Sequence, residues 1–458
     1  MKKLLTTIVL SLCGTFSQAN SLLEHFPQAT ISVYAINLEK DKELISISPY
    51  SHLHGASTLK IITALHAART FSPDYRFQTT AYASRKPRNG VLSTSLTVEF
   101  VGDPSLKTEQ LQRLAKKIRE AGIEKITGNL IINVNRYSGH DRAKAWNFSD
   151  RGICFAGGNS AAQVNYNCVT ATLRPNKKIG ELATFETKDE IVQVTNKVRI
   201  APKDSYEKCE LNYSNDIGLS FTLSGCLIPS KHPVYLNLAV PDGNLYTAHV
   251  LANALKNEGI SFRSIKIQET PLPPNLLTIA SIKGAKISTL IQQMLANSDN
   301  HIAEQLFRNI AYAQTKYSVN YTIATHIEKA FMDSLNLDTV KVDGSGLSYH
   351  NRTTAYDLVN VMKAINLEDS RIHLLHLFPT AKQGTLASHK AFQDYPDLIG
   401  KTGSIYGANC FVGQFKNKDG DTIIFAYLIN NRLMKNKQEL ENFERDLLTQ
   451  LNNVENQE

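Results

Sequence analysis

The sequence lacks a second long apolar run and has no cluster of basic residues. After Leu4–Leu12, no stretch approaches the roughly 18 apolar residues that a membrane-spanning helix needs. The formal net charge is +8, but the 50 Lys and Arg residues are spread along the chain, which indicates a solvated surface rather than a nucleic-acid binder. We therefore expect no stable membrane insertion and no nucleic-acid partner.

The N-terminus has the pattern of a secretory signal peptide. Met1-Lys2-Lys3 precedes the apolar run, and Ser17-Gln18-Ala19 places small residues before a cleavage site. We predict a signal peptide at residues 1–19, cleaved after Ala19; the alternative is a buried N-terminal helix. Cleavage would remove two lysines and no acid and leave a net charge of +6. Cys13 follows a leucine rather than a small residue, which argues against lipidation.

Cysteine is also scarce, with six residues in the chain. Four of them form two local pairs in one region, Cys154 with Cys168 and Cys209 with Cys226. In an oxidising compartment we predict disulfides within these pairs, although four cysteines permit three connectivities. Cys410 is left over in an apolar, strand-like stretch and is expected to be a buried thiol.

The order of apolar and polar residues predicts an α+β chain of several domains, because about 440 residues are too many for one core. A strand hairpin is expected at residues 30–48. Two helices that end in glycine, 109–120 and 245–257, lead into strands at 128–132 and 261–262, which suggests partners in one small domain. The segment 140–235 carries the paired cysteines and is expected to be mostly β.

The C-terminal part is expected to return to long helices and an apolar sheet. Helix is predicted over 282–313, 323–334 and 354–365, and strands over 407–414 and 422–429. The last helix places Leu440, Phe443, Leu447, Leu448 and Leu451 on one face and Glu439, Glu441, Glu444 and Asp446 on the other. Membrane-surface helices favour basic residues on the polar face, so we expect this helix to pack onto the sheet.

Ser57-Thr58-Leu59-Lys60 precedes a run of helix formers and provides a candidate nucleophile. Residues three apart share a helix face, so the Lys60 amine can reach the Ser57 hydroxyl and remove its proton. The helix N-terminus adds backbone N–H groups where negative charge would develop. This spacing also occurs by chance, as at Ser205 and Lys208.

Two further motifs follow in order: Ser298-Asp299-Asn300 at the start of an amphipathic helix, and Lys401-Thr402-Gly403-Ser404 before an apolar strand. The ordered set Ser-x-x-Lys, Ser-Asp-Asn and Lys-Thr-Gly in a secreted chain is typical of serine β-lactamases and penicillin-binding proteins. Each residue also has a plain structural reading, such as a helix N-cap for Ser298 or a solvated surface side chain for Lys401.

With these motifs the sequence resembles the class C low-molecular-mass penicillin-binding proteins, the D-alanyl-D-alanine carboxypeptidase/endopeptidases of the penicillin-binding protein 4 type in serine peptidase family S13. The resemblance covers essentially the whole mature chain. It extends to Gly102–Leu106, Trp146–Phe155, Asp343–Ser348 and Gly384–Leu386, and to the 241-residue separation of Ser57 from Ser298.

The resemblance implies a transpeptidase/β-lactamase-like domain, with a five-stranded antiparallel sheet and helices on both sides, built from 20–74 and 272–458. It would carry an inserted α+β domain (75–139 and 236–271) and a nested, mostly β domain with two disulfides (140–235). It also implies a periplasmic enzyme that acts on peptidoglycan stem peptides ending in D-Ala-D-Ala and on cross-linked muropeptides, is inhibited by β-lactam antibiotics, and needs no metal or cofactor.

The resemblance assigns roles to the motif residues. Ser57 is the nucleophile, Lys60 the general base, and Ser298 relays a proton to the leaving amine. Asn300 binds the substrate amide, Lys401 supplies positive potential, and Thr402 and Ser404 hold the terminal carboxylate. Gly403 permits close approach of the strand. The backbone N–H groups of Ser57 and Ser404 form the oxyanion hole.

The sequence departs from the family pattern at two places. Tyr349 follows Asp343–Ser348 where the family usually has Arg. Two residues more than in the family separate Trp146 from Cys154, and Asp150 is the nearest candidate for the acid associated with the stem diamino acid, outside the catalytic set. Asp343 and its glycines are as compatible with a structural turn as with a substrate contact. The alternatives are a β-lactamase-like hydrolase, although Tyr-x-Asn does not replace Ser-Asp-Asn, and a non-catalytic peptidoglycan-binding scaffold. The oligomeric state stays open.

Overall fold

The computed structural model describes residues 21–175, 177–215, 218–432 and 437–453, and these group into two compact units. The first unit comprises the described residues up to Asp74, Ile287–Ile310, and the described residues from Thr322 onward. The second comprises Tyr75–Lys286 and Ala311–Tyr321. The predicted signal peptide, residues 1–19, lies outside the described residues.

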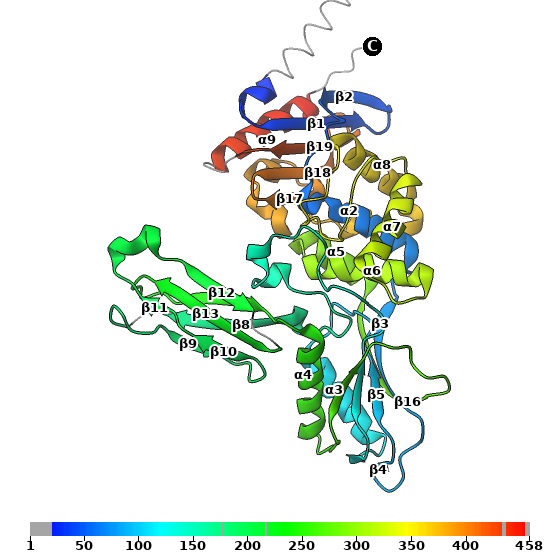
Figure 1. The fold of residues 1–458 in the computed structure, drawn as a ribbon. Helices are drawn as coiled ribbons and strands as arrows, with labels where there is room; N and C mark the ends of the chain where they lie inside the picture. Colours follow the sequence, from blue (N-terminus) through cyan, green and yellow to red (C-terminus); the bar gives the residue numbers. More distant parts are fainter. Residues whose placement is uncertain (1–20, 176, 216–217, 433–436, 454–458) are drawn as a thin grey trace, which may run out of the picture. The chain divides into compact units, whose positions relative to one another are not determined.

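The first unit contains a five-stranded antiparallel sheet in the order β17-β18-β19-β1-β2 (Figure 1). Its strands are β1 (Thr30–Asn37), β2 (Lys42–Ile47), β17 (Ile399–Ile405), β18 (Ala408–Lys416) and β19 (Thr422–Asn430). The expected hairpin and the two expected C-terminal strands are therefore confirmed. The Lys-Thr-Gly motif, which the pattern placed before a strand, lies inside the edge strand β17. Glycines at positions 400 and 403 weaken the strand signal there.

Helices pack on both faces of this sheet, α8 (Ala355–Ile372) on one and α9 (Lys437–Asn452) on the other. The other helices are α2 (Lys60–Thr70), α5 (Ile287–Asn297), α6 (Asn300–Thr315) and α7 (Tyr321–Asp333), with short 3-10 segments η1 (Ala56–Leu59), η6 (Leu375–Leu377), η7 (Gly384–Ser388) and η8 (Lys390–Asp394). On one face, α8 packs against β1 and β19, where the Tyr34 and Tyr356 rings lie 5.2 Å apart.

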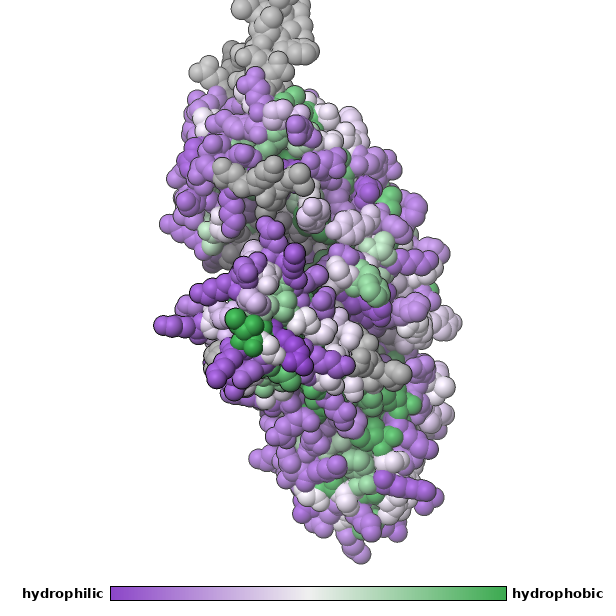
Figure 2. All heavy atoms as spheres, turned by 60° about the vertical axis from the view of Figure 1, so that its left-hand side comes forward, coloured by the Kyte–Doolittle hydropathy of each residue, from purple (hydrophilic) through white to green (hydrophobic). Residues whose placement is uncertain are grey.

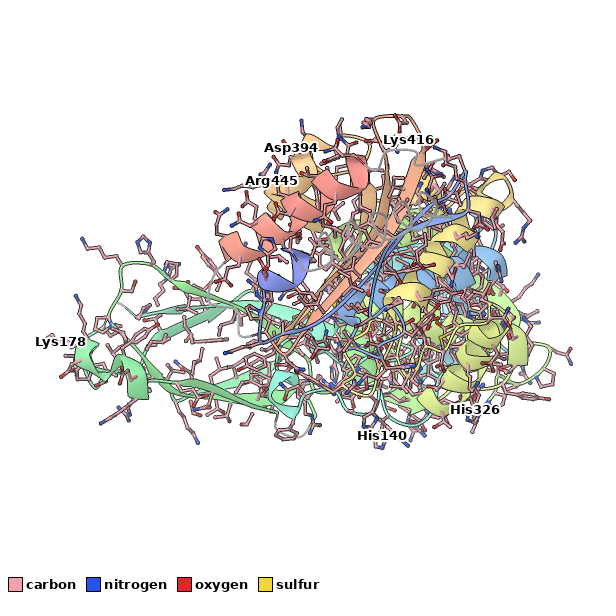
Figure 3. The ribbon with its side chains drawn as sticks, turned by 90° about the horizontal axis from the view of Figure 1, so that it is seen from above. His140, Lys178, His326, Asp394, Lys416 and Arg445 are labelled. Atoms are coloured by element: carbon pink, nitrogen blue, oxygen red, sulfur yellow. A yellow bond between two sulfur atoms is a disulfide. The ribbon has the colours of Figure 1, made fainter. Side chains whose placement is uncertain are left out.

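On the other face, α9 packs onto the sheet through the apolar stripe predicted from the sequence. Phe443, Leu447 and Leu448 are fully buried in one core with residues of β1 and β19, and each buried leucine contributes about 2 kcal/mol. An ion pair of 2.7 Å from Arg445 to Asp394 also ties α9 to η8 (Figure 3). Glu444 was expected on the polar face of this helix, and that was wrong. The side chain is 1% exposed, and its carboxylate is hydrogen-bonded to Tyr427 Oη and His389 Nδ1.

The prediction of helix over 282–313 was wrong for the first residues of that range. Residues up to Lys286 belong to the strand β16 (Leu277–Lys286), which pairs with β3 (Arg76–Ala83). The remainder forms α5 and α6, separated at Ser298 and Asp299. Segment 272–286, expected in the transpeptidase-like domain, therefore groups with the second unit, because strand pairing fixes it there.

The second unit contains a mixed five-stranded sheet in the order β15-β7-β5-β3-β16 (Figure 1). Its other strands are β5 (Leu96–Glu99), β7 (Leu130–Asn133) and β15 (Ile265–Gln268), its helices are α3 (Thr108–Glu120) and α4 (Gly243–Asn257), and the short strands β4 (Val91–Leu92) and β6 (Lys125–Ile126) pair separately. The two helix–glycine–strand units pair as expected, since β7 and β15 are parallel neighbours and α3 packs on α4. The strand expected at 261–262 begins later, at Ile265.

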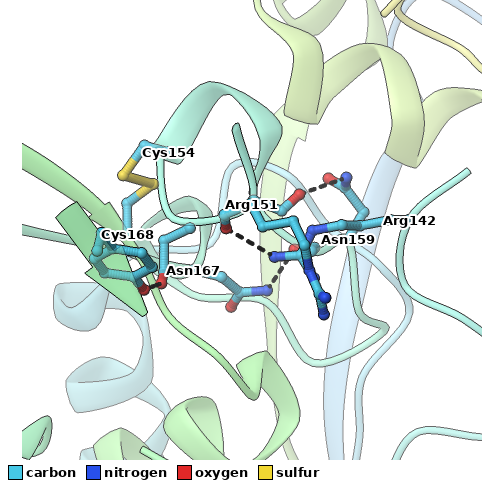
Figure 4. The surroundings of a disulfide bond; sticks show 10 residues. Arg142, Arg151, Cys154, Asn159, Asn167 and Cys168 are labelled. Carbon is cyan, nitrogen blue, oxygen red and sulfur yellow. Dashed lines mark hydrogen bonds between the residues drawn. A yellow bond between two sulfur atoms is a disulfide. The ribbon is translucent and has the colours of Figure 1, made fainter. Parts of the chain in front are cut away.

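The remaining strands of the second unit form two small sheets. They are β8 (Cys168–Arg174), β9 (Thr184–Thr187), β10 (Gln193–Asn196), β11 (Arg199–Ile200), β12 (Leu211–Asn215), β13 (Ser220–Leu227) and β14 (Val234–Ala239). Strand β14 pairs with β8, so this β region continues past residue 235. The predicted disulfides are present, with Cα–Cα separations of 5.6 Å for Cys154–Cys168 (Figure 4) and 5.3 Å for Cys209–Cys226.

Hydrophilic residues cover most of the surface that faces the viewer in Figure 2. Among the described residues, no helix is both long and apolar enough to cross a membrane. Cys410 is the free cysteine of the described residues and is buried, as expected.

Candidate active site

Ser57 lies in the 3-10 turn η1, directly before α2. The preceding residue, Ala56, has a φ of +46°, a left-handed conformation that is costly for a residue with a Cβ. Hydrogen bonds hold this turn: the Thr58 hydroxyl donates to the Gly55 carbonyl at 2.6 Å, and the Ala56 N–H donates to His54 Nδ1 at 3.0 Å. The strained, pinned turn fixes the position of the serine hydroxyl.

The Lys60 amine lies among three oxygen atoms. Its Nζ is 2.8 Å from Ser57 Oγ, 2.7 Å from Asn300 Oδ1 and 2.7 Å from the Ser345 carbonyl. The amide and carbonyl oxygens can only accept hydrogen bonds, whereas a hydroxyl can also donate. A neutral Lys60 therefore gives its two N–H groups to Asn300 and Ser345, and its lone pair faces the Ser57 hydroxyl. The arrangement aims a base at the serine.

Burial makes the neutral form of Lys60 accessible. The side chain is fully buried, and desolvation lowers the pKa of Lys60 to about 8. The carboxylates of Asp343, Glu304 and Asp299 oppose this shift, and the Lys341 ammonium adds to it. A buried lysine with this pKa is suited to general-base catalysis.

The segment Asp343–Ser348 forms the turn that presents the Ser345 carbonyl to Lys60. The buried Asp343 carboxylate accepts hydrogen bonds from the N–H groups of Gly346 at 2.9 Å and Ser348 at 2.7 Å. Gly346 has a φ of +87°, and a Cβ there would lie 2.0 Å from the Ala56 carbonyl oxygen. Of the two readings left open by the sequence, the geometry therefore favours the structural turn for Asp343.

Ser298 and Asn300 lie on either side of the α6 N-terminus. The Asp299 carboxylate accepts a hydrogen bond of 2.9 Å from the Ile302 N–H, so Asp299 caps the helix. Ser298 has a φ of +58° and lines the cavity in front of Ser57. The reading of Ser298 as an ordinary N-cap is therefore wrong, and Ser298 lines the same cavity as Ser57.

Strand β17 brings the Lys-Thr-Gly segment against the Ser57 turn. A Cβ on Gly403 would lie 2.7 Å from the Gly55 oxygen and 3.1 Å from the Ser57 nitrogen, so the backbones could not approach this closely with a side chain there. Lys401 is fully buried rather than solvated, and burial together with the Lys60 charge holds the pKa of Lys401 well below its usual value. Thr402 Oγ1 donates to Thr385 Oγ1 at 2.6 Å.

These residues open onto one cavity of about 640 Å³ in the first unit. Its wall includes Ser57, Ser298, Thr402, Gly403 and Ser404. All three motifs, which lie far apart in the sequence, thus meet around one hydroxyl. The combination of nucleophile, buried amine and adjacent edge strand can perform acyl transfer without a histidine.

Some candidates lie elsewhere. Ser205 and Lys208, the chance Ser-x-x-Lys match, belong to the 3-10 segment η5 (Lys203–Lys208) of the second unit. Asp150 ends the segment η2 (Phe148–Asp150) in that unit, and its proposed contact stays a prediction. Within the described parts of the chain, no group of three or more His, Cys, Asp or Glu residues could hold a metal ion.

Sequence reasoning missed the Ser345 carbonyl and the hydroxyl of Thr385 as parts of this site. A main-chain carbonyl carries no residue-type signal, so only the tertiary structure reveals it. Thr385 lay in a stretch noted for family resemblance, which was the available signal.

Tyr349, which stands where the family usually has Arg, is 38% exposed. Its carbonyl accepts a hydrogen bond of 2.8 Å from Arg352, an arginine that lies three residues later in the same loop.

Nearly the whole chain is similar to known carboxypeptidases. A model of the D-Ala-D-Ala carboxypeptidase 3 (S13) family matches residues 17–453. The D-alanyl-D-alanine carboxypeptidase DacB of Haemophilus influenzae is 28% identical over 455 residues, which is 95% of either chain. A D-alanyl-D-alanine carboxypeptidase of an Actinomadura species is 21% identical over 423 residues, 88% of this chain and 78% of that one.

Solved structures show the same fold. Penicillin binding protein 4 (dacB) of Haemophilus influenzae matches with a TM-score of 0.91 and 27% identity, covering 95% of this chain and 99% of that one. A structure of that protein complexed with a β-lactam matches with a TM-score of 0.86, 26% identity, and coverage of 94% and 99%. The peptidoglycan endopeptidase Bd3459 of Bdellovibrio bacteriovorus, at 17% identity, a TM-score of 0.52 and coverage of 92% and 93%, shares the fold.

Proposed function

The chain belongs to the D-Ala-D-Ala carboxypeptidase 3 (S13) family, and from this premise we propose that Ser57 is the nucleophile of a serine carboxypeptidase and endopeptidase that acts on peptidoglycan. The family assignment and the penicillin-binding protein 4 relatives make the chain a serine-type D-Ala-D-Ala carboxypeptidase. The residue roles, the action on cross-links and the location belong to the proposal. The observation that carries it is the Lys60 amine held between Ser57 Oγ, Asn300 Oδ1 and the Ser345 carbonyl.

In the proposed acylation step, neutral Lys60 takes the Ser57 proton while Oγ attacks the carbonyl carbon between the last two D-alanines. The negative charge that develops on the carbonyl oxygen is stabilised by the N–H groups of Ser57 and Ser404, each donor being worth about 3 kcal/mol. The C–N bond then breaks, and the Ser298 hydroxyl relays a proton to the leaving amine. The product is an acyl ester on Ser57.

Residues of the same site would also position the substrate. Thr402 and Ser404 hold the terminal carboxylate, Lys401 contributes positive potential, Gly403 admits the substrate backbone, and Asn300 binds the substrate amide. Water hydrolyses the ester in the second step, with Lys60 again able to accept a proton. A carboxypeptidase releases D-alanine by this route, and an endopeptidase releases the amine half of a peptide cross-link.

The proposed setting is the periplasm, where the predicted signal peptide would deliver the protein and where its peptidoglycan substrate occurs. An oxidising compartment also suits the two disulfides. The β-lactam complex of the Haemophilus influenzae relative supports binding of these antibiotics, and the proposed nucleophile Ser57 is the residue that they would acylate.

The test is to incubate the mature protein with a labelled penicillin and to locate the adduct by peptide mass. We expect a long-lived adduct on Ser57, absent in Ser57→Ala, together with D-alanine release from a pentapeptide stem that the variant also lacks. Ser205→Ala, which alters the chance motif, is the matched control and should retain both signals. Rapid loss of the adduct with hydrolysed drug would indicate a β-lactamase. If folded, disulfide-intact protein forms no adduct, the alternative of a non-catalytic peptidoglycan-binding scaffold is the one that remains.

A further inference from the structure

The catalytic cavity continues well beyond the motif residues. From Thr402 and Ser404 it extends along the sheet face that carries α9, as far as Lys390 at the start of η8 and Lys437 at the start of α9. The whole space is about 640 Å³, several times the volume of one alanine residue. D-alanine alone would therefore fill only a small part of this space.

The charges along this extension are unevenly compensated. Glu444 is bonded to Tyr427 and His389, and Glu441 lies 3.5 Å from Arg445. Among the described residues, the side chain of neither Lys390 nor Lys437 forms a hydrogen bond or an ion pair. Lys437 also occupies the first turn of α9, where the helix macrodipole disfavours a cation. Two ammonium groups therefore remain available to an anionic ligand.

We propose that this extension binds the amine-side half of a peptide cross-link, and that Lys390 and Lys437 are specificity-determining residues for it. The inference rests on the proposed function, because the placement of the terminal carboxylate at Thr402 and Ser404 puts the leaving group on this side of Ser57. A stem peptide that leaves in place of D-alanine is longer and carries at least one further carboxylate, at its own C-terminus. The two lysines match that charge.

The test compares two substrates on the mature enzyme and on the double variant Lys390→Ala/Lys437→Ala. One substrate is a monomeric pentapeptide stem, which releases D-alanine, and the other is a cross-linked stem dimer. We expect kcat/KM for the dimer to fall about tenfold, and D-alanine release and penicillin acylation to change by less than about twofold. Added salt should slow dimer cleavage by the wild type and leave the variant nearly unaffected.

Two controls separate this pocket from a general charge effect. Lys382→Ala/Lys418→Ala removes the same charge from exposed positions outside the cavity and should leave both activities unchanged. Lys390→Arg/Lys437→Arg keeps the charge and should retain dimer cleavage. An equal loss on both substrates, no loss on the dimer, or a wild type that releases D-alanine without cutting the dimer would each overturn the inference. Absence of both D-alanine release and the Ser57 adduct in the wild type would instead refute the proposed function.

Discussion

Asn300 Oδ1 accepts a hydrogen bond of 2.7 Å from Lys60 Nζ, although 240 residues separate the two in the chain. This contact joins the start of α6 to the start of α2 and, together with the Ser345 carbonyl, leaves the lone pair of neutral Lys60 facing Ser57. An acceptor-only partner at this place directs an N–H of the neutral amine away from the serine. The protonation state of Lys60 is therefore coupled to the side chain at position 300.

We predict that Asn300→Asp raises the pKa of Lys60. A carboxylate beside Nζ stabilises the ammonium, so less neutral amine is present at neutral pH. Penicillin acylation at pH 7 should fall at least tenfold, and its pH dependence should move upward by about one unit or more. Asn300→Ala, which removes the contact without adding charge, should lower acylation without that upward movement. Identical profiles for the two variants would contradict the prediction.

The wild-type enzyme should show a pH dependence set by Lys60. The base must be neutral, and its pKa is lowered by burial to about 8. The acylation rate constant should therefore rise with pH, with a slope near one below about pH 8, and level off above it. The measurement is the second-order rate of labelled-penicillin attachment between pH 6 and pH 10. A rate that is flat over this range would exclude Lys60 as the base.

Gly403→Ala should disable the site and leave the fold intact. The added Cβ would lie 2.7 Å from the Gly55 oxygen and 3.1 Å from the Ser57 nitrogen, so β17 must move away from the Ser57 turn. We expect acylation to fall by about 100-fold, as when one oxyanion donor is lost. The control, Gly420→Ala, has open space and a φ of +85°, so it should cost about 1 kcal/mol of stability and keep acylation.

A buried ion pair near the site should be important for stability. Glu328 is bonded to Lys341 at 2.5 Å and to His66 at 2.6 Å, and all three side chains are at most 3% exposed. Burial alone would raise the pKa of Glu328, but Lys341 and His66 lower it to about 2. Removing one partner leaves a charge buried without its full compensation.

We expect Lys341→Met to lower the free energy of unfolding by about 3–5 kcal/mol. Lys329→Met is the control: it breaks the exposed pair with Asp333 and should cost about 0.5 kcal/mol or less. Because the native pKa of Glu328 lies below its unfolded value, the pair contributes fully above about pH 4.5 and is lost as pH falls towards 2. Urea unfolding at pH 7 and pH 3 measures both effects, and equal losses for the two variants would refute the assignment.

The sequence alone identified the family, the three motifs and most of the elements. The spacing of apolar residues located the hairpin β1–β2, the helices α3, α4 and α9, and the strands β18 and β19. It could do so because apolar residues recur with a different period in helices and in strands. The disulfide pairs followed from short spacing. The proposed nucleophile, Ser57, and its proposed base, Lys60, were found from their separation by three residues on one helical turn.

Only the tertiary structure decided what surrounds that pair. The Ser345 carbonyl, the buried state of Lys401 and Glu444, and the capping of α6 by Asp299 rather than Ser298 depend on contacts between distant segments. The end of the strand β16, residues 282–286, was predicted as helix, because the sequence does not reveal the pairing with β3 that overrides local preference. Residue type and spacing carry no record of which main-chain carbonyl lies beside Lys60, or of how far its burial lowers the lysine's pKa.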